Sequence, residues 1–174
     1  IFPEKNMIQT SIGKAEYDYL VLAAGTTTNF FGNKHIEEEA MPMKNVSEAM
    51  GLRNALLANL ERALPCTTKQ EQQELLNIVI VGGGATGVEV AGVLSEMKKF
   101  VLPNDYPDMP ASLMHVYLVE AGPRLLAGMS EDSSAHAEKF LREMGVNILL
   151  NKRVVDYRDH KVMLEDGSEI ATRT

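Results

Sequence analysis

The stretch that decides the fold is Ile78-Val79-Ile80-Val81-Gly82-Gly83-Gly84-Ala85-Thr86-Gly87-Val88-Glu89-Val90-Ala91-Gly92. Its four leading apolar residues predict a short buried strand, and the residues after the glycines follow a helical pattern. A strand, a glycine turn and a helix together are the context in which G-x-G-x-x-G indicates a dinucleotide site. A glycine-rich turn without any nucleotide is the alternative.

The glycines of this motif have separate predicted roles. Gly82 can take the tight turn, Gly84 lets a pyrophosphate approach the backbone, and Gly87 lets the helix pack closely on the strand. The start of the helix would supply free N–H groups and the positive end of its dipole. The other residues of the predicted phosphate-binding turn are Gly83, Ala85 and Thr86.

A second strand that ends in an acidic residue follows, as the fingerprint requires. Residues 114–120 read MHVYLVE, and Glu120 is placed to accept hydrogen bonds from both hydroxyls of the adenosine ribose. Its charge would repel a 2′-phosphate and favours NADH over NADPH, although Arg124 keeps NADPH open. Glu120 follows Gly87 by 33 residues, where about 20 are expected. Residues 102–110 contain three prolines, and we predict an insertion there that ends the helix and accounts for the excess.

Three segments, GGGATGVEVAG, PNDYPDMP and VEAGPRLLAGMSE, together resemble the NADH-binding domain of type II NADH dehydrogenases. The resemblance runs from Tyr17 to about Thr172. It implies a membrane-peripheral flavoprotein with two dinucleotide-binding domains, which passes electrons from NADH through FAD to quinone. The glycine motif alone would indicate only the wider flavoprotein disulfide-reductase superfamily.

The resemblance also implies roles for residues outside the glycine turn. Glu89 would face the nicotinamide and flavin rings and orient the carboxamide, unless it only complements the helix dipole. Val154 would pack against the adenine, with core packing as the alternative. Residues 17–27, YDYLVLAAGTT, would form a strand that links the two domains, with a simple turn after the strand as the alternative. The remaining implied site residues are Ala121 for NADH and Ala23, Ala24, Gly25 and Thr26 near the FAD of the parent protein.

The expected fold class is α/β: a Rossmann-like dinucleotide-binding domain with a parallel sheet plus an antiparallel β-meander, and short pieces of the FAD domain at the N-terminus. Residues 146–150 are predicted to be the third parallel strand. Strands at 154–157 and 161–164, followed by an Asp166-Gly167 turn, predict the meander. The expected domains are the end of the FAD-binding domain and a crossover strand (1–27), a linker with helices (28–76) and the NADH-binding domain (77–174).

Four helices are predicted from apolar periodicity and capping residues. They are residues 48–64 with Ser47 as N-cap, residues 70–76, residues 85 to about 100, and a helix capped by Ser130 whose apolar side is Ala135, Phe140, Leu141 and Met144.

Composition narrows the function further. The net charge of −7, without a basic run, argues against a nucleic-acid partner. The single cysteine, Cys66, excludes an internal disulfide, a C-x-x-C pair and a cysteine metal cluster. The four histidines have no metal-ligand spacing, and the carboxylates of residues 37–39 are better explained as a solvated loop or helix end. We therefore expect no metal.

The first hypothesis is the NADH-binding part of an FAD-dependent NADH:quinone oxidoreductase, cut from a longer polypeptide. The chain alone would bind NADH without turnover, and parts of the parent outside it would meet quinone and membrane. The parent would be cytoplasmic, peripheral on the cytoplasmic face of the inner membrane, and possibly a homodimer. The alternatives are an NAD(P)H-dependent flavoprotein reductase with a ferredoxin or disulfide acceptor, and a non-catalytic NAD-sensing domain.

Overall fold

A parallel three-stranded sheet lies at the centre of the structure, a computed structural model that describes residues 1–174. Its strands, in spatial order, are β3 (Asn77–Val81), β4 (His115–Val119) and β5 (Asn147–Leu149). All neighbours run parallel, and the register pairs Ile80 with Leu118 and Leu118 with Ile148. The three predicted strands are therefore confirmed to within the usual uncertainty of element boundaries.

The two faces of the sheet are covered by different layers, because successive side chains of a strand point to opposite faces. Ile78, Leu118 and Ile148 belong to the larger core, which helices cover. Val79, Val119 and Leu149 instead pack with the second sheet. That sheet is an antiparallel meander of β6 (Val154–Arg158), β7 (Lys161–Leu164) and β8 (Glu169–Ala171). The predicted α/β fold with a parallel sheet and a β-meander is confirmed.

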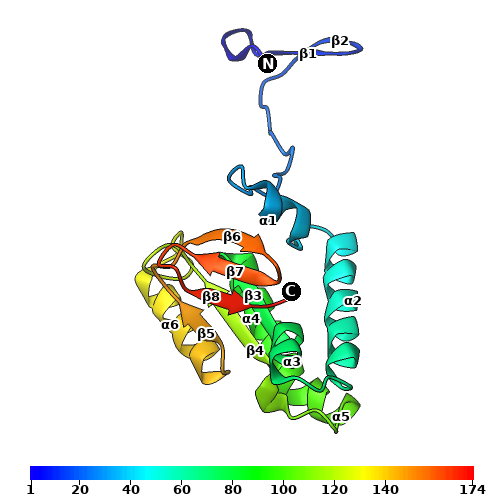
Figure 1. Ribbon diagram of the computed structural model, residues 1–174. Coiled ribbons are helices and arrows are strands. Elements are labelled where there is room, and N and C mark those ends of the chain that lie inside the picture. Colours follow the sequence, from blue (N-terminus) through cyan, green and yellow to red (C-terminus); the bar gives the residue numbers. More distant parts are fainter.

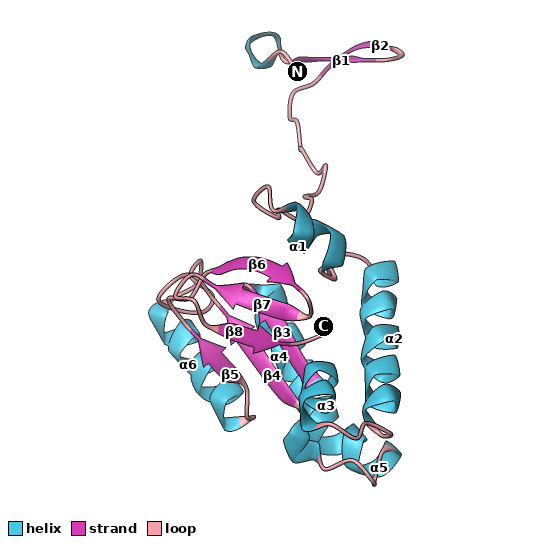
Figure 2. Cartoon of the chain, viewed as in Figure 1, coloured by secondary structure: helices cyan, strands magenta, loops and turns pink.

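The helices flank the sheets (Figure 2). The four longest are α2 (Val46–Ala63), α3 (Lys69–Leu76), α4 (Ala85–Glu96) and α6 (Glu131–Glu143). In Figure 2, α6 lies at the left of the body and α2 at the right. The every-fourth-residue leucine pattern of α2 is used as predicted, since Leu56 and Leu60 are buried in the larger core. The predicted Ser130 cap of α6 is also confirmed, because its Oγ accepts the N–H of Ser133 at 3.2 Å.

The start of α2 lies two residues earlier than predicted. Asn45, not Ser47, is the N-cap, and its Oδ1 accepts the N–H of Glu48 at 2.9 Å. The Glu48 carboxylate reaches back to the N–H of Lys44 at 2.6 Å. This reciprocal pair, similar to a capping box, satisfies two backbone donors. A serine cap at position 47 would have satisfied fewer.

The helix ends within the proline-containing insertion as predicted, but about five residues later than expected. The chain continues from α4 through a π-helical turn, η2 (Met97–Val101), into α5 (Leu102–Asp105) and leaves the helix at Tyr106. Pro103 lies in the first turn of α5, directly after the π-helical turn. The Leu102 N–H bonds to the Met97 carbonyl, and the Asn104 amide donates to the Phe100 carbonyl at 2.7 Å. A short 3₁₀ turn, η3 (Ala111–Leu113), then leads into β4.

The predicted apolar side of α6 is only partly correct. Leu141 is buried, but Phe140 is 59% exposed, and Ala135 and Met144 are exposed as well. Ser134 takes the second buried position and donates its hydroxyl to the Leu125 carbonyl at 2.6 Å. A buried serine with a partner is invisible to a purely apolar pattern. Gly145, with φ +86°, ends the helix as predicted.

The N-terminal segment stands away from the body (Figure 1). It contains a 3₁₀ turn, η1 (Pro3–Lys5), and the hairpin of β1 (Met7–Thr10) and β2 (Gly13–Glu16), whereas α1 (Lys34–Glu39) contacts β6. The hairpin agrees with the prediction, but the predicted strand at residues 17–27 is absent. A strand needs a neighbour for its backbone groups, and none lies beside this segment. The first buried residue of the chain is Leu56.

The last four residues are tied to the middle of the chain. Thr172, 1% exposed, donates its hydroxyl to the Asn77 carbonyl at 2.5 Å, and the Asn77 amide donates to the Ala171 carbonyl at 2.8 Å. The Val79 N–H bonds to the Thr174 carbonyl at 2.9 Å. These bonds fix the outer edge of β3, the strand that leads into the glycine turn.

Candidate functional site: the glycine turn after β3

The glycine turn is held by a close backbone contact that leaves no space for a side chain. Gly82 has φ +109°, a region that favours glycine, and its N–H bonds to the Val119 carbonyl at 2.8 Å. A Cβ on Gly87 would lie 2.0 Å from the Gly82 carbonyl oxygen. The predicted roles of a tight turn and of close helix–strand packing therefore match the geometry.

The two middle glycines face different surroundings. A Cβ on Gly83 would lie 2.7 Å from Leu125 Cδ2 and 3.1 Å from Glu120 Cγ, so the protein itself excludes a side chain there. A Cβ on Gly84 would meet nothing within 4 Å, and this residue is exposed. The side of the turn at Gly84 is thus open to a ligand.

The first turn of α4 presents unpaired backbone donors on this open side. Gly84 is the N-cap, and the Val88 N–H makes the bond to its carbonyl at 3.0 Å. The N–H groups of Ala85, Thr86 and Gly87 precede this bond and have no partner within the helix. Together with the positive end of the helix dipole they suit a phosphate group.

Glu120 lies beside the turn, at the carboxyl end of β4. Its Oε2 accepts the Gly83 N–H at 2.6 Å, and its Oε1 accepts the Gly122 N–H at 2.6 Å. An ionised carboxylate has about four acceptor positions, so each oxygen can accept a further bond. Glu120 thus links the glycine turn to the end of β4 and retains the capacity to bind two hydroxyls.

The loop after β4, part of the VEAGPRLLAGMSE segment, holds the turn from the other side. The Leu126 N–H bonds to the Gly83 carbonyl at 2.7 Å, and Leu125 is fully buried. The Arg124 guanidinium donates to the carbonyls of Ala127 at 2.8 Å and Met129 at 3.1 Å. Ala121, predicted at this site, is exposed just before the loop.

The two side chains with roles implied only by resemblance lie farther along the chain. Glu89 is the fifth residue of α4, is exposed, and lies just beyond the first turn of the helix. The first turn has no acidic residue, which weakens the alternative that Glu89 merely complements the dipole. Val154 pairs with Leu164 and packs, partly exposed, against the meander core.

The segment predicted near a flavin does not form a site in this chain. Ala23, Ala24, Gly25 and Thr26 are exposed, and nothing lies within 4 Å of the position of a Cβ on Gly25. One side-chain hydrogen bond is present, from Lys44 Nζ to the Thr26 hydroxyl. These residues by themselves do not fit an FAD.

Metal-ligand clusters and membrane-spanning helices are both absent from the structure. No three His, Cys, Asp or Glu side chains are grouped so that they could hold a metal ion. No helix has both the length and the apolar character that crossing a membrane requires.

Comparisons with known proteins agree with this geometry. The family model described as pyridine nucleotide-disulphide oxidoreductase matches residues 3–174. The chain is 31% identical over 157 residues to the type II NADH:quinone oxidoreductase Ndh of Mycobacterium tuberculosis, covering 90% of this chain and 34% of that protein. It is 34% identical over 165 residues to the type II NADH:quinone oxidoreductase of Haemophilus influenzae, covering 88% and 37%. The resemblance inferred from the sequence is confirmed.

A solved structure extends the likeness over nearly the entire chain. NDH2 from Plasmodium falciparum in complex with NADH superposes with a TM-score of 0.82 at 25% identity, covering 99% of this chain and 37% of that one. A ferredoxin reductase from Rhodopseudomonas palustris, at 18% identity and TM-score 0.64, shares the fold. The chain spans about a third of the length of the curated relatives it matches.

Proposed function

The chain belongs to the pyridine nucleotide-disulphide oxidoreductase family, and on this premise we propose that it forms the NADH-binding part of an FAD-dependent NADH:quinone oxidoreductase. One observation carries the proposal: Glu120 and the open first turn of α4 meet at Gly83, where the Glu120 carboxylate bonds to the backbone at 2.6 Å. A hydroxyl-binding group would then lie beside a phosphate-binding one, as dinucleotide binding requires.

The residues of the turn fit the adenosine and pyrophosphate of NADH. The free N–H groups of Ala85, Thr86 and Gly87 would bind the pyrophosphate, and the absence of a side chain at Gly84 lets it approach. The Glu120 oxygens would accept bonds from the two ribose hydroxyls.

The chain contributes binding and orientation to the reaction. When bound, NADH supplies the hydride and the FAD of the parent protein accepts it before quinone is reduced. Glu89, exposed on α4 beyond the pyrophosphate-binding turn, would accept a hydrogen bond from the nicotinamide carboxamide and set the orientation of that ring. Val154 would cover one face of the adenine with the part of its surface that the meander leaves exposed.

Selectivity for NADH over NADPH follows from charge and from the surroundings of Arg124. A 2′-phosphate on the ribose would lie against the negative charge of Glu120. Arg124 already donates two of its five N–H groups to the carbonyls of Ala127 and Met129, so fewer remain to offset this repulsion. Both effects favour NADH.

The first test is calorimetric titration of the purified chain with NADH and NADPH. We expect saturable NADH binding and much weaker NADPH binding. Glu120→Ala should weaken NADH by about tenfold or more, because it removes hydrogen bonds to a charged acceptor. Glu61→Ala, which removes an exposed carboxylate of α2, is the matched control and should bind like the unmodified chain. Equal binding of both nucleotides by a folded chain would contradict the assignment of Glu120.

Turnover is expected only from the longer parent protein. With FAD and a soluble quinone added, the chain should bind NADH without oxidising it, because residues 23–26 provide no contacts that would retain a flavin. NADH oxidation by the chain would contradict this. Because quinones dissolve in membranes, we place the parent at a membrane surface. Its location at the cytoplasmic face and its assembly as a homodimer stay predictions.

Two alternatives are separated by assays on the parent. A reductase for ferredoxin or a disulfide shares the fold, but the relatives at 31–35% identity are named quinone oxidoreductases. Faster reduction of ferredoxin than of quinone would favour that alternative. A nucleotide-sensing protein would bind NADH and reduce neither.

A further inference from the structure

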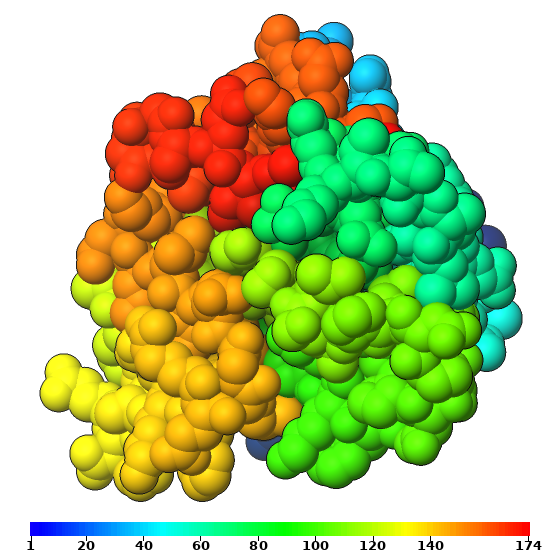
Figure 3. All heavy atoms as spheres, turned by 60° about the horizontal axis from the view of Figure 1, so that its bottom comes forward, coloured from blue at the N-terminus to red at the C-terminus, as the bar shows by residue number.

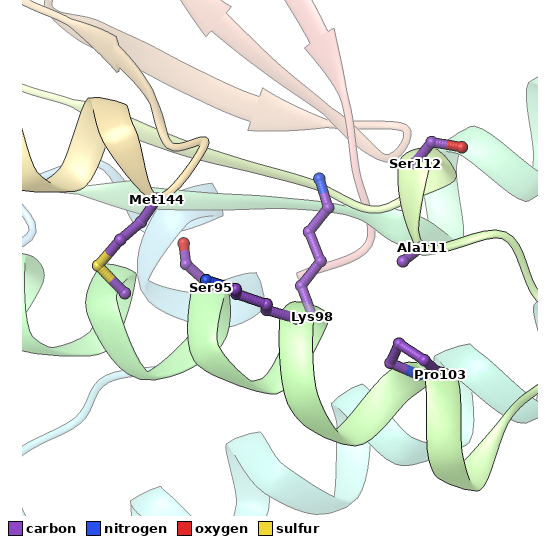
Figure 4. Close-up of a pocket in the computed structure, with 7 residues that line it drawn as sticks. Ser95, Lys98, Pro103, Ala111, Ser112 and Met144 are labelled. Carbon is purple, nitrogen blue, oxygen red and sulfur yellow. The ribbon is translucent and has the colours of Figure 1, made fainter.

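A second candidate site lies at the end of α4 that is opposite the glycine turn. A pocket of about 350 Å³ opens between the turns η2 and η3, the start of α5 and the end of α6 (Figure 4). The twelve residues of α4 place this pocket roughly 18 Å along the helix axis from the dinucleotide-binding turn. Figure 3 shows the face of the body where the residues of α6 and β5 meet those of η2 and α5.

The hydroxyl of Ser95 faces the pocket. Ser95 is 3% exposed, and its hydroxyl makes no hydrogen bond within the protein, although it lines the pocket wall. In Figure 4 this hydroxyl points to the same side of the helix as the side chain of Lys98. The hydroxyl is accessible from the pocket, so it is free to donate to and accept from a ligand there.

Two lysines on η2 give the pocket a positive charge. Lys98 and Lys99 both line it, and neither lies within 4 Å of a carboxylate oxygen. Burial lowers the pKa of Lys98, and no acidic side chain offsets this. Burial, and then the charge of Lys98, lower the pKa of nearby His115. No acidic residue lines the pocket, although the whole chain carries a net charge of −7.

The remaining wall is mostly apolar, and the π-helical turn holds it in place. Met144, the C-cap of α6, lines it together with Pro103, Ala111 and Ser112. Leu102, which follows the π-helical turn, is fully buried and anchors this part of the chain. Single π-helical turns are rare and frequently occur at functional sites. Here the turn carries both lysines.

We propose that this pocket binds a small phosphate monoester, with the phosphate at Ser95, Lys98 and Lys99 and the organic group against Met144, Pro103 and Ala111. A phosphate monoester is a dianion and can pair with both ammonium groups, whereas a carboxylate carries a single charge. Lysine binds phosphate as a point charge. The ester group accounts for the apolar wall. This site is separate from the dinucleotide-binding turn and does not depend on the proposed function.

The test uses phenyl phosphate as probe and amide chemical shifts of the ¹⁵N-labelled chain as readout, in the presence of saturating NADH. We expect saturable shifts at residues 95–99 and 111–112. Lys98→Met keeps the length and apolar stem of the side chain and should raise the Kd about tenfold, since a charged hydrogen bond is lost. Ser95→Ala should raise it a few-fold. Lys69→Met, at an exposed position of α3, is the matched control and should leave the Kd unchanged.

Separate outcomes would overturn the proposal. Shifts confined to residues 82–87 would mean that the phosphate only enters the dinucleotide-binding turn. An unchanged Kd in Lys98→Met would remove the lysine from the site. Equal affinity for benzoate would assign the pocket to carboxylates instead of phosphate esters. Should Lys98→Met fail to fold, Lys99→Met and Ser95→Ala test the same pocket.

Discussion

Two small-residue segments were both predicted to approach a cofactor, and the structure treats them differently. Residues 82–87 lie between β3, Glu120 and the loop after β4, and a Cβ at Gly87 would lie 2.0 Å from backbone. Residues 23–26 are exposed, and Gly25 has open space around it. A glycine is sterically required at Gly87 because atoms of this chain would clash with a Cβ there. At Gly25 this chain has no neighbouring atoms, so nothing in it requires a glycine for lack of space. The difference between the two segments can be measured.

The largest expected effect is that of Gly87→Ala. The new methyl group overlaps the Gly82 carbonyl, so the helix must move away from β3, and we expect a loss of about 3 kcal/mol in the free energy of unfolding. NADH binding should be lost together with it. Urea denaturation monitored by circular dichroism measures the first effect, and calorimetry the second.

Gly25→Ala is the matched control for that substitution. Gly25 has φ +72°, which alanine adopts poorly. Because nothing packs on residues 23–26, the chain can adjust there, and we expect a change of less than about 0.5 kcal/mol. Comparable losses at Gly25 and Gly87 would show that the N-terminal segment is packed in solution, and the comparison would fail.

The two ends of the chain give a second, smaller contrast. Thr172 is buried, donates to the Asn77 carbonyl at 2.5 Å, and accepts the Thr174 N–H at 3.0 Å. Thr172→Val keeps the shape but leaves these buried backbone groups unpaired, which should cost about 2 kcal/mol. Thr27→Val, at an exposed position without such bonds, should change stability by less than about 0.5 kcal/mol. The same urea titration measures both variants. If Thr172→Val cost as little stability as Thr27→Val, the C-terminal segment would not be part of the folded core.

Sequence alone was sufficient for features that depend on neighbouring residues. The strand–turn–helix at Gly82, the Ser130 cap and the Gly145 stop were all predicted, because each is decided by a few adjacent side chains. Glu120 was also found, since a strand end has a fixed place in this kind of sheet.

The predictions from sequence were wrong where a distant or competing hydrogen-bond partner determines the local structure. Asn45 prevails over Ser47 because Glu48 completes a reciprocal cap. Phe140 is exposed while the hydroxyl of Ser134 bonds across to Leu125, a contact nine residues away. The π-helical turn before Pro103 could not be read from proline content.

The smallest expected effect concerns the contact between the N-terminal segment and the body at α1. Asp156 on β6 bonds to Arg158 Nε at 2.6 Å, and to the Asn33 amide and the His35 ring at 3.3 Å each. Asn33 also donates to the Val155 carbonyl at 2.8 Å. Asn33 and His35 therefore hold α1 against the meander.

Acid should loosen this contact within a definite range of pH. Burial acts to raise the pKa of Asp156, but the N–H of Tyr157, the Asn33 amide and the charges of Arg158 and His35 together hold it below the usual value. A lowered folded-state pKa stabilises the contact above the unfolded pKa of about 3.9. That stability is lost as the pH falls below this value and through the folded-state pKa.

An NMR titration of the Asp156 carboxyl carbon should give a midpoint below 3.9, with the amide signals of residues 33–39 changing at the same midpoint. In Asp156→Asn those amide changes should disappear. Amide signals that do not follow the carboxyl would mean that α1 is held without Asp156, through Asn33 and the Val155 carbonyl alone.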